Sequence, residues 1–277
     1  MSGGAVSARS ALSATAVAAA SALLAGCTST ASSGSGGSDI NLVQSGKLTT
    51  CTHLPYAPFQ SKEGKEIVGF DVDLVDLIAS SLKVKQEIVD TPFEGIQSGE
   101  DLNANKCDVA AAGMTINEVR EKNLDFSAPY FEATQALVTK KGKPYSSLAD
   151  LSGKKVAVQQ GTTGEAYAQK HAKGAKLVQF EDLALLLTAV KTGQVDAGVN
   201  DNGVLYDYVK DNPDTEVTAE FNTGEQYGIA VRTGNDALRK KINKVLKAAR
   251  SDGRYDRIYK KWFGTTPKKS ATKPAAN

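Results

Sequence analysis

Residues 108–130 read DVAAAGMTINEVREKNLDFSAPY, and a buried strand, a turn and an arginine follow one another closely in this stretch. The apolar run 109–112 has the length expected of a fully buried strand, and Gly113 ends it where a residue without a Cβ leaves the backbone open to a ligand. The polar residues that follow predict a short helix, capped by Thr115 or Asn117. Arg120 lies about a turn and a half beyond Thr115, so its guanidinium can fold back to the strand end. These groups suit a carboxylate, although alone they also fit a solvated arginine beside an ordinary turn.

Length and composition indicate a soluble protein of two compact lobes. The chain has 277 residues, of which 41% are hydrophobic and 23% charged, and these are ordinary values for a globular protein of this size. The formal net charge is +2, and the basic pairs at 154–155 and 268–269 are short. Nothing in this pattern indicates nucleic acid as a partner.

The N-terminal residues are typical of an export signal that ends at a lipidated cysteine. Arg9 is the only charge before Cys27, and an alanine-rich apolar run covers 11–25. This run is shorter than the roughly 20 residues that span a membrane. LAGC at 24–27 looks like a bacterial lipobox, so we expect a signal peptide over 1–26 and an acylated Cys27. The Ser/Gly-rich residues up to 40 predict a flexible tether.

From Lys47 onward the pattern alternates strands and helices, which favours a mainly parallel α/β fold. Strands are expected at 47–52, 86–89, 108–112, 155–158 and 195–200, and helices near 74–82, 183–190 and 238–249, with Asp71 or Asp73 capping the first helix. Apolar crossing segments at 136–139 and 226–231 divide the chain into lobes. We predict a first lobe over 41–135 and 231–264, an inserted second lobe over 136–230, and a disordered tail over 265–277.

Ligands bind at the carboxyl ends of strands in open α/β sheets, and polar or aromatic residues gather there in this chain. Just beyond the carboxyl ends of three strands of the first lobe lie His53, Tyr56, Phe93, Gly113 and Thr115. In the second lobe a helix opens near Thr163, where free amides suit an anion. Asp201 follows the last strand of that lobe and is either a site residue or the cap of the next turn.

Four segments carry a resemblance to a known family. They are GMTIN with Arg120 and DFSAPY, GFDVDL at 69–74, YGIA at 227–230 and YKKWFG at 259–264. These segments resemble the polar amino-acid-binding proteins of bacterial ABC importers. That group contains glutamine, histidine and lysine/arginine/ornithine receptors. The resemblance covers nearly all of 42–264. It implies a two-lobed periplasmic-binding-protein fold of type II, joined by two crossing strands, and an extracytoplasmic, lipid-anchored monomer without cofactor that delivers an α-amino acid to the importer's permease.

The resemblance also implies a role for each site residue. The α-carboxylate would be bound by Arg120, the amide of Thr115 and the helix opening at Thr163. The α-ammonium would be bound by Asp201 and the Gly113 carbonyl. Tyr56 and Phe93 would cover the side chain, and His53, Gln159 and Asn200 would face it. The receptors resembled here have aspartate at the position of His53, and the glutamine receptor has lysine and histidine at those of Gln159 and Asn200. The side-chain end is therefore expected to be polar and nearly uncharged.

Alternatives of other classes remain at this point. The same architecture hosts a dehydratase of aromatic-acid precursors, for which Glu165 is the candidate general acid, although glutamate in a first helical turn more often stabilises the helix dipole. A sensory subunit is a second alternative. Cys51 and Cys107 are expected to be buried free thiols, with a disulfide as the alternative. His53 and His171 have no paired spacing, so no metal site is predicted.

Overall fold

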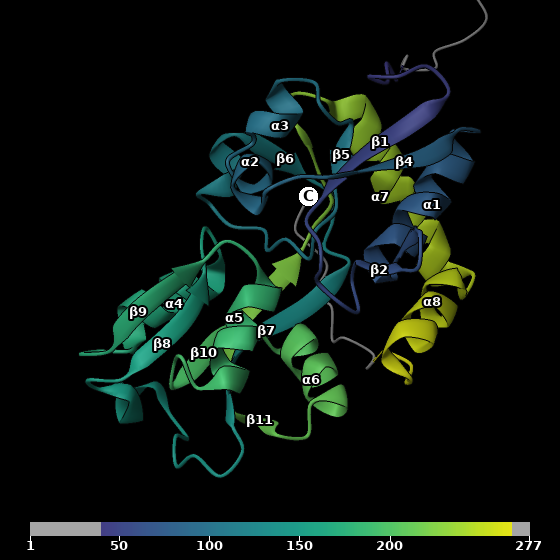
Figure 1. The fold of residues 1–277 in the computed structure, drawn as a ribbon. Helices are drawn as coiled ribbons and strands as arrows, with labels where there is room; N and C mark the ends of the chain where they lie inside the picture. Colours follow the sequence, from purple (N-terminus) through teal and green to yellow (C-terminus); the bar gives the residue numbers. More distant parts are fainter. Residues whose placement is uncertain (1–39, 268–277) are drawn as a thin grey trace, which may run out of the picture. The chain divides into compact units, whose positions relative to one another are not determined.

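Two mixed sheets organise residues 40–267, which are the residues that the computed structural model describes (Figure 1). The predicted signal peptide, Cys27, the tether up to residue 39 and the tail from residue 268 lie outside them. The first sheet has the order β4-β1-β5-β12-β6 and the second the order β11-β7-β10-β8-β9. In the first sheet β4, β1 and β5 run parallel, and β12 is antiparallel to both of its neighbours. In the second sheet β10, β8 and β9 run parallel, and β7 is antiparallel to both of its neighbours. The predicted α/β fold with two sheets is confirmed, and each sheet is mixed.

The elements around the first sheet come from both ends of the described chain. They are β1 (Lys47–Thr52), β2 (Ser61–Glu63), β3 (Glu66–Val68), α1 (Phe70–Ser81), β4 (Lys85–Asp90), α2 (Phe93–Gln97), α3 (Glu100–Asn103), β5 (Val109–Ala110), η1 (Arg120–Lys122), β6 (Leu124–Phe126), β12 (Ala230–Arg232), α7 (Asp236–Ser251) and α8 (Arg254–Phe263). The helix α8 was not predicted as an element of its own.

Burial on both faces explains why the run at 109–112 is continuously apolar. Val109 and Ala111 pack with α1 and α7 on one face of the first sheet. Ala110 and Ala112 pack with α2 and α3 on the other face. Successive side chains of a strand point to opposite faces, so a strand covered by helices on both sides needs apolar residues throughout.

The start of α1 differs from the prediction. The helix begins at Phe70, with Gly69 in the N-cap position and no side-chain cap. A Cβ on Gly69 (φ 151°) would lie 1.9 Å from the Phe59 carbonyl oxygen, so this approach requires glycine. Asp71 and Asp73 therefore lie inside the first turn. Asp71 is buried against the first sheet, and Asp73 accepts hydrogen bonds from Lys261 and Trp262 of α8.

The second sheet forms from a continuous part of the chain. Its elements are β7 (Phe131–Lys140), η2 (Leu148–Leu151), β8 (Lys155–Gln159), α4 (Thr163–His171), β9 (Lys176–Phe180), α5 (Leu183–Thr192), β10 (Ala197–Asp201), α6 (Asn202–Asp211) and β11 (Thr215–Tyr227). The predicted stop of α5 at Gly193 is confirmed, because this residue is the C-cap with φ 79°. Residues 136–139, predicted as a crossing segment, lie within β7, paired to both β10 and β11.

The chain passes between the sheets twice, from Phe126 to Phe131 and from Tyr227 to Ala230. Aromatic rings pack around these passages: the Phe59 ring lies 4.9 Å from that of Phe131 and 5.2 Å from that of Tyr227, measured between centroids. The rings of α8 join the same cluster through Phe263, 5.2 Å from Phe131. Within residues 40–267, no helix is long and apolar enough to cross a membrane.

The cysteines of the first sheet are paired, which corrects the expectation of free thiols. Cys51 and Cys107 form a disulfide, with Cα atoms 5.6 Å apart. In the register of β1 and β5, Cys51 lies beside Ala110. A straight extension of β5 would carry Cys107 three residues away, beyond reach. The segment before β5 instead arrives from α3, where the Lys106 amide bonds to the Asp101 carbonyl, and this bend brings the sulfurs together.

We expect this disulfide to stabilise the protein substantially, because it closes a loop across 56 residues. The double variant Cys51→Ala/Cys107→Ala should lose about 2–4 kcal/mol of unfolding free energy in urea. A reductant should lower the unfolding midpoint of the unmodified protein and leave that of the double variant unchanged. Equal midpoints for the oxidised and reduced unmodified protein would contradict the prediction.

Candidate functional site

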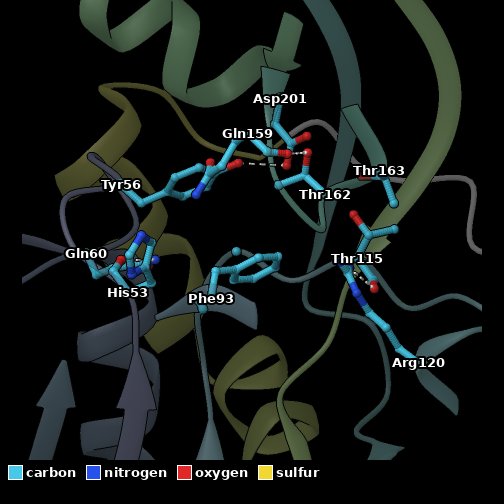
Figure 2. Close-up of a pocket in the computed structure, with 12 residues that line it drawn as sticks. His53, Tyr56, Gln60, Phe93, Thr115, Arg120, Gln159, Thr162, Thr163 and Asp201 are labelled. Atoms are coloured by element: carbon cyan, nitrogen blue, oxygen red, sulfur yellow. Dashed lines mark hydrogen bonds between the residues drawn. The ribbon is translucent and has the colours of Figure 1, made fainter. Parts of the chain in front are cut away.

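A pocket of about 340 Å³ lies where both sheets present the carboxyl ends of their strands. It is lined by His53, Tyr56, Gln60, Phe93, Ala112, Gly113, Thr115, Arg120, Gln159, Thr162, Thr163 and Asp201. All the predicted site residues line it except Asn200. Gln60, Ala112 and Thr162 were not predicted. Figure 2 shows Arg120 and Thr115 at one end of the pocket, His53 and Gln60 at the other, and Phe93 between them.

Arg120 is held as a buried cation by the turn that precedes it. The Asn117 side chain accepts a hydrogen bond from the Arg120 amide at 2.9 Å, at the start of the 3₁₀ turn η1. The guanidinium donates to the Thr115 carbonyl at 2.7 Å and to the Gly161 carbonyl at 3.1 Å. Its carbon lies 5.3 Å from the centre of the Phe93 ring. Burial lowers the Arg120 pKa to about 10, and nearby acids oppose that shift, so the guanidinium stays charged at neutral pH.

Gly113 brings main chain to the wall of the pocket. Its φ is 56°, and a Cβ there would lie 2.7 Å from the Tyr56 ring, so any larger residue would displace that ring. The Gly113 amide donates to Asp71 at 2.8 Å, and the Tyr130 hydroxyl donates to the same oxygen at 2.8 Å. Burial raises the Asp71 pKa to about 7, and both hydrogen bonds oppose the shift. Asp71, predicted as a helix cap, fixes the Gly113 peptide instead.

Asp201 faces the pocket and does not cap the following turn. It occupies the N-cap position of α6 without a side-chain cap bond. Its carboxylate accepts hydrogen bonds from Tyr56 at 3.0 Å, from the Tyr227 hydroxyl and from the Gln135 amide. Burial is the main cause that raises the Asp201 pKa to about 6, and the charge of Glu225 adds to it. At neutral pH this site therefore holds a buried anion that lacks a bonded cation among the described residues.

Glu225 is a site residue that sequence reasoning missed. Its carboxylate accepts hydrogen bonds from the Thr115 hydroxyl at 2.8 Å and from the Thr163 hydroxyl at 2.7 Å, and Gln135 donates to it as well. It thus connects residues carried by the first and second sheets. Glu225 lies two positions before Tyr227 on β11, and residues two apart share a face of a strand. That spacing indicates a shared strand face, but the sequence has no local signal for the contact with Thr115, which is 110 positions away.

The end of the pocket opposite Arg120 is lined by polar side chains without a carboxylate. His53 Nδ1 lies 3.0 Å from the Thr91 carbonyl oxygen, and the Gln60 amide donates to the His53 carbonyl at 3.3 Å. Gln159 accepts a hydrogen bond from Asn200 at 3.2 Å. Asn200 stands behind the wall, where its side-chain oxygen accepts from Tyr56. It was predicted to face the ligand's side chain from the family resemblance, but it is not among the residues that line the pocket.

The predicted helix opening near Thr163 is the start of α4. Thr162 is the N-cap and accepts a hydrogen bond from the Glu165 amide at 3.1 Å, and Thr163 is the first helical residue. The Glu165 carboxylate points back to the Gly161 amide at 2.8 Å and also accepts from Gln169 and Gln179. Glu165 is buried, and it is not among the residues that line the pocket. The candidate general acid therefore acts as a structural anchor of the Gly161 turn.

The two buried charges of the pocket suit a small zwitterion. The buried guanidinium of Arg120 lies near one end of the pocket. The buried carboxylate of Asp201, whose pKa is raised, is a second charged group in its lining. A charged group that is buried in a protein is stabilised by an opposite charge with hydrogen bonds. A ligand with one anionic and one cationic group would supply both. Tyr56 and Phe93 offer apolar surface between these groups.

Comparisons with known proteins agree with this arrangement. Residues 48–265 match the family of bacterial extracellular solute-binding proteins, family 3. The ABC transporter glutamine-binding protein GlnH of Bacillus subtilis (strain 168) is 40% identical over 210 residues, which cover 73% of this chain and 75% of that protein. An ancestral arginine-binding protein bound to arginine has a TM-score of 0.76 and 48% identity over 79% of this chain and 99% of that chain. An ancestral arginine-binding protein bound to glutamine has a TM-score of 0.76 and 47% identity over 80% of this chain and 99% of that chain.

Proposed function

Since this chain belongs to the bacterial extracellular solute-binding proteins of family 3, we propose that it is a lipid-anchored receptor that delivers a polar α-amino acid to an ABC importer. It is a binding protein and not an enzyme, as its relatives are amino-acid-binding proteins. The observation that carries the proposal is the pair of buried charges, Arg120 and Asp201, in one pocket between the two sheets. A free α-amino acid has the complementary pair of charges on one carbon atom.

We assign the two ends of the ligand to the two charges. The Arg120 guanidinium would bind the α-carboxylate, because its planar fork matches a planar anion, and the Thr115 amide and the opening of α4 at Thr163 would add donors. Asp201 and the Gly113 carbonyl would accept from the α-ammonium. Tyr56 and Phe93 would cover the ligand's side chain. A thermal-shift screen of the twenty amino acids tests the assignment, because a ligand at a hundredfold excess over Kd adds about 2.7 kcal/mol of stability.

Ligand binding is expected to close the two lobes around the pocket. Arg120 of the first lobe donates a hydrogen bond to the Gly161 carbonyl of the second lobe at 3.1 Å, so the two lobes are in contact beside the pocket. A ligand that contacts both lobes favours this form by its higher affinity for it. Small-angle X-ray scattering should show a smaller radius of gyration when the best amino acid is added. Unchanged scattering at verified saturation would contradict closure driven by the ligand.

Membrane attachment is proposed to depend on Cys27, which lies outside the described residues. The LAGC sequence at 24–27 and the Ser/Gly-rich segment after it support a diacylated N-terminus on a flexible tether. Two acyl chains anchor a protein far more stably than one. The unmodified protein should fractionate with membranes, and Cys27→Ser should release it or block its maturation. Recovery of native protein from the medium without lipid by mass spectrometry would contradict the anchor.

A further inference from the structure

Two buried hydrogen-bond acceptors without partners lie side by side at the end of the pocket opposite Arg120. The Gln60 side-chain oxygen and His53 Nε2 are both inaccessible to solvent and have no hydrogen-bond partner among the described residues. Gln60 is 1% exposed, and one N–H of its side-chain amide is committed to the His53 carbonyl. Both residues line the pocket. Gln60 therefore retains its unpartnered oxygen and the second N–H of the amide.

The tautomer of His53 is fixed by its other nitrogen. Nδ1 lies 3.0 Å from the Thr91 carbonyl oxygen, and a carbonyl oxygen can only accept. In the neutral imidazole Nδ1 therefore carries the proton, and Nε2 presents a lone pair. These two residues thus offer two unpartnered acceptors, beside the second N–H of the Gln60 amide. A ligand that fits it must bring N–H or O–H groups.

Charge selects among the side chains that carry such donors. Asp201 is the only acidic residue among those that line the pocket, and it belongs to the network of Tyr56, Tyr227 and Gln135. A guanidinium or ammonium buried against His53 and Gln60 would have no carboxylate beside it, and a buried unpaired charge is costly. A carboxylate would face two acceptors. A neutral carboxamide has two N–H donors and no charge.

From these contacts we infer that the ligand's side chain ends in a carboxamide and that the receptor prefers glutamine to glutamate, arginine and methionine. This inference rests on the proposed function and names the ligand within its class. Gln60 and His53 are then the residues that determine specificity, through their unpartnered acceptors. Gln159 contributes less, because its side-chain oxygen already accepts from Asn200.

Calorimetry at pH 8 with ligand-free protein tests the order of affinities. Methionine has the length of glutamine but no donors, so it would leave both acceptors unpaired. Each buried unpaired acceptor costs about 1–3 kcal/mol, so glutamine should bind roughly 30-fold or more tightly than methionine, and glutamate should be no better than methionine. Arginine is expected to be about 10-fold weaker than glutamine. Binding of glutamate, arginine or methionine within threefold of glutamine would overturn the inference.

Two variants place a carboxylate in the same wall. Gln60→Glu and His53→Asp should each raise the affinity for arginine relative to glutamine by about 10-fold or more. Two positions are tested because Gln60 is deeply buried and its variant could fail to fold. Gln44→Glu is the matched control, since Gln44 is exposed and is not among the lining residues, and it should leave the ratio unchanged. An unchanged ratio in the folded pocket variants would overturn the inference. Failure of every amino acid to bind would instead overturn the proposed function itself.

Discussion

Replacement of Arg120 by alanine is expected to abolish detectable binding of every amino acid, whatever its side chain. Loss of one partner from a buried, hydrogen-bonded ion pair costs roughly 2–5 kcal/mol, because the other charge is left unpaired. The ligand's α-carboxylate would lose its cation in a pocket where Glu225 already accepts from the hydroxyls of Thr115 and Thr163. Calorimetry against the best ligand would measure the loss, and circular dichroism would establish that the variant is folded.

Arg120→Lys separates charge from geometry. Lysine keeps the positive charge but cannot bind a carboxylate with two parallel N–H groups, and it would not reach the carbonyls of Thr115 and Gly161 together. We expect weak residual binding in this variant and none in Arg120→Ala. Near-native affinity in a folded Arg120→Ala variant would show that the α-carboxylate lies elsewhere.

Asp201→Asn is expected to abolish binding and at the same time to stabilise the ligand-free protein above pH 6. Asparagine can keep the hydrogen bond from Gln135 with its oxygen and can donate to the Tyr56 and Tyr227 hydroxyls. The ligand's ammonium, however, would lose its anion.

The pH dependence follows from the Asp201 pKa, which burial raises to about 6. The native state then binds more protons than the unfolded state between about pH 4 and pH 6, so unfolding free energy falls as pH rises through this window. The unfolding free energy lost across this window is on the order of 3 kcal/mol, and Asp201→Asn should recover part of it at pH 8.

In the unmodified protein, the affinity for the amino acid should fall about tenfold per pH unit below pH 6, because a proton must leave Asp201 before the ligand's ammonium binds. Thermal melts and titrations across pH 4–8 would measure both. A variant less stable than the parent at pH 8 would contradict the prediction.

Some of this architecture follows directly from the sequence, because its cause is local. The run at 109–112 is apolar throughout, which only a strand covered on both faces requires, and Gly113 marks its end. Arg120 and Asp201 each follow a predicted strand at a short distance, but their residue types left other roles open, and the family resemblance selected them. The structure places both in the pocket, while their roles as ligands of the carboxylate and ammonium remain predictions.

Contacts between distant residues could not be predicted in this way. Glu225 reaches Thr115 across 110 positions, and an isolated acidic residue on a strand of alternating exposure reads as surface. Gln60 was overlooked for the same reason, since a polar residue after an aromatic one resembles a loop. The disulfide was misjudged because strand register alone separates Cys51 from Cys107, and only the bend after α3 unites them. Asp71 looked like a helix cap because its partners, Gly113 and Tyr130, are 42 and 59 positions away.

The position of β12 has a consequence for how the chain matures. In the first sheet β12 lies between β5 and β6, and β6 pairs with no other strand of that sheet. During export the residues up to 135 therefore emerge before the strand that completes their sheet. The second sheet has all its strands between 131 and 227, so we expect it to fold first, as a contiguous unit. The unfinished first lobe would meanwhile expose the edge of β5, and it is the part of the nascent protein that chaperones and proteases outside the cytoplasm would meet.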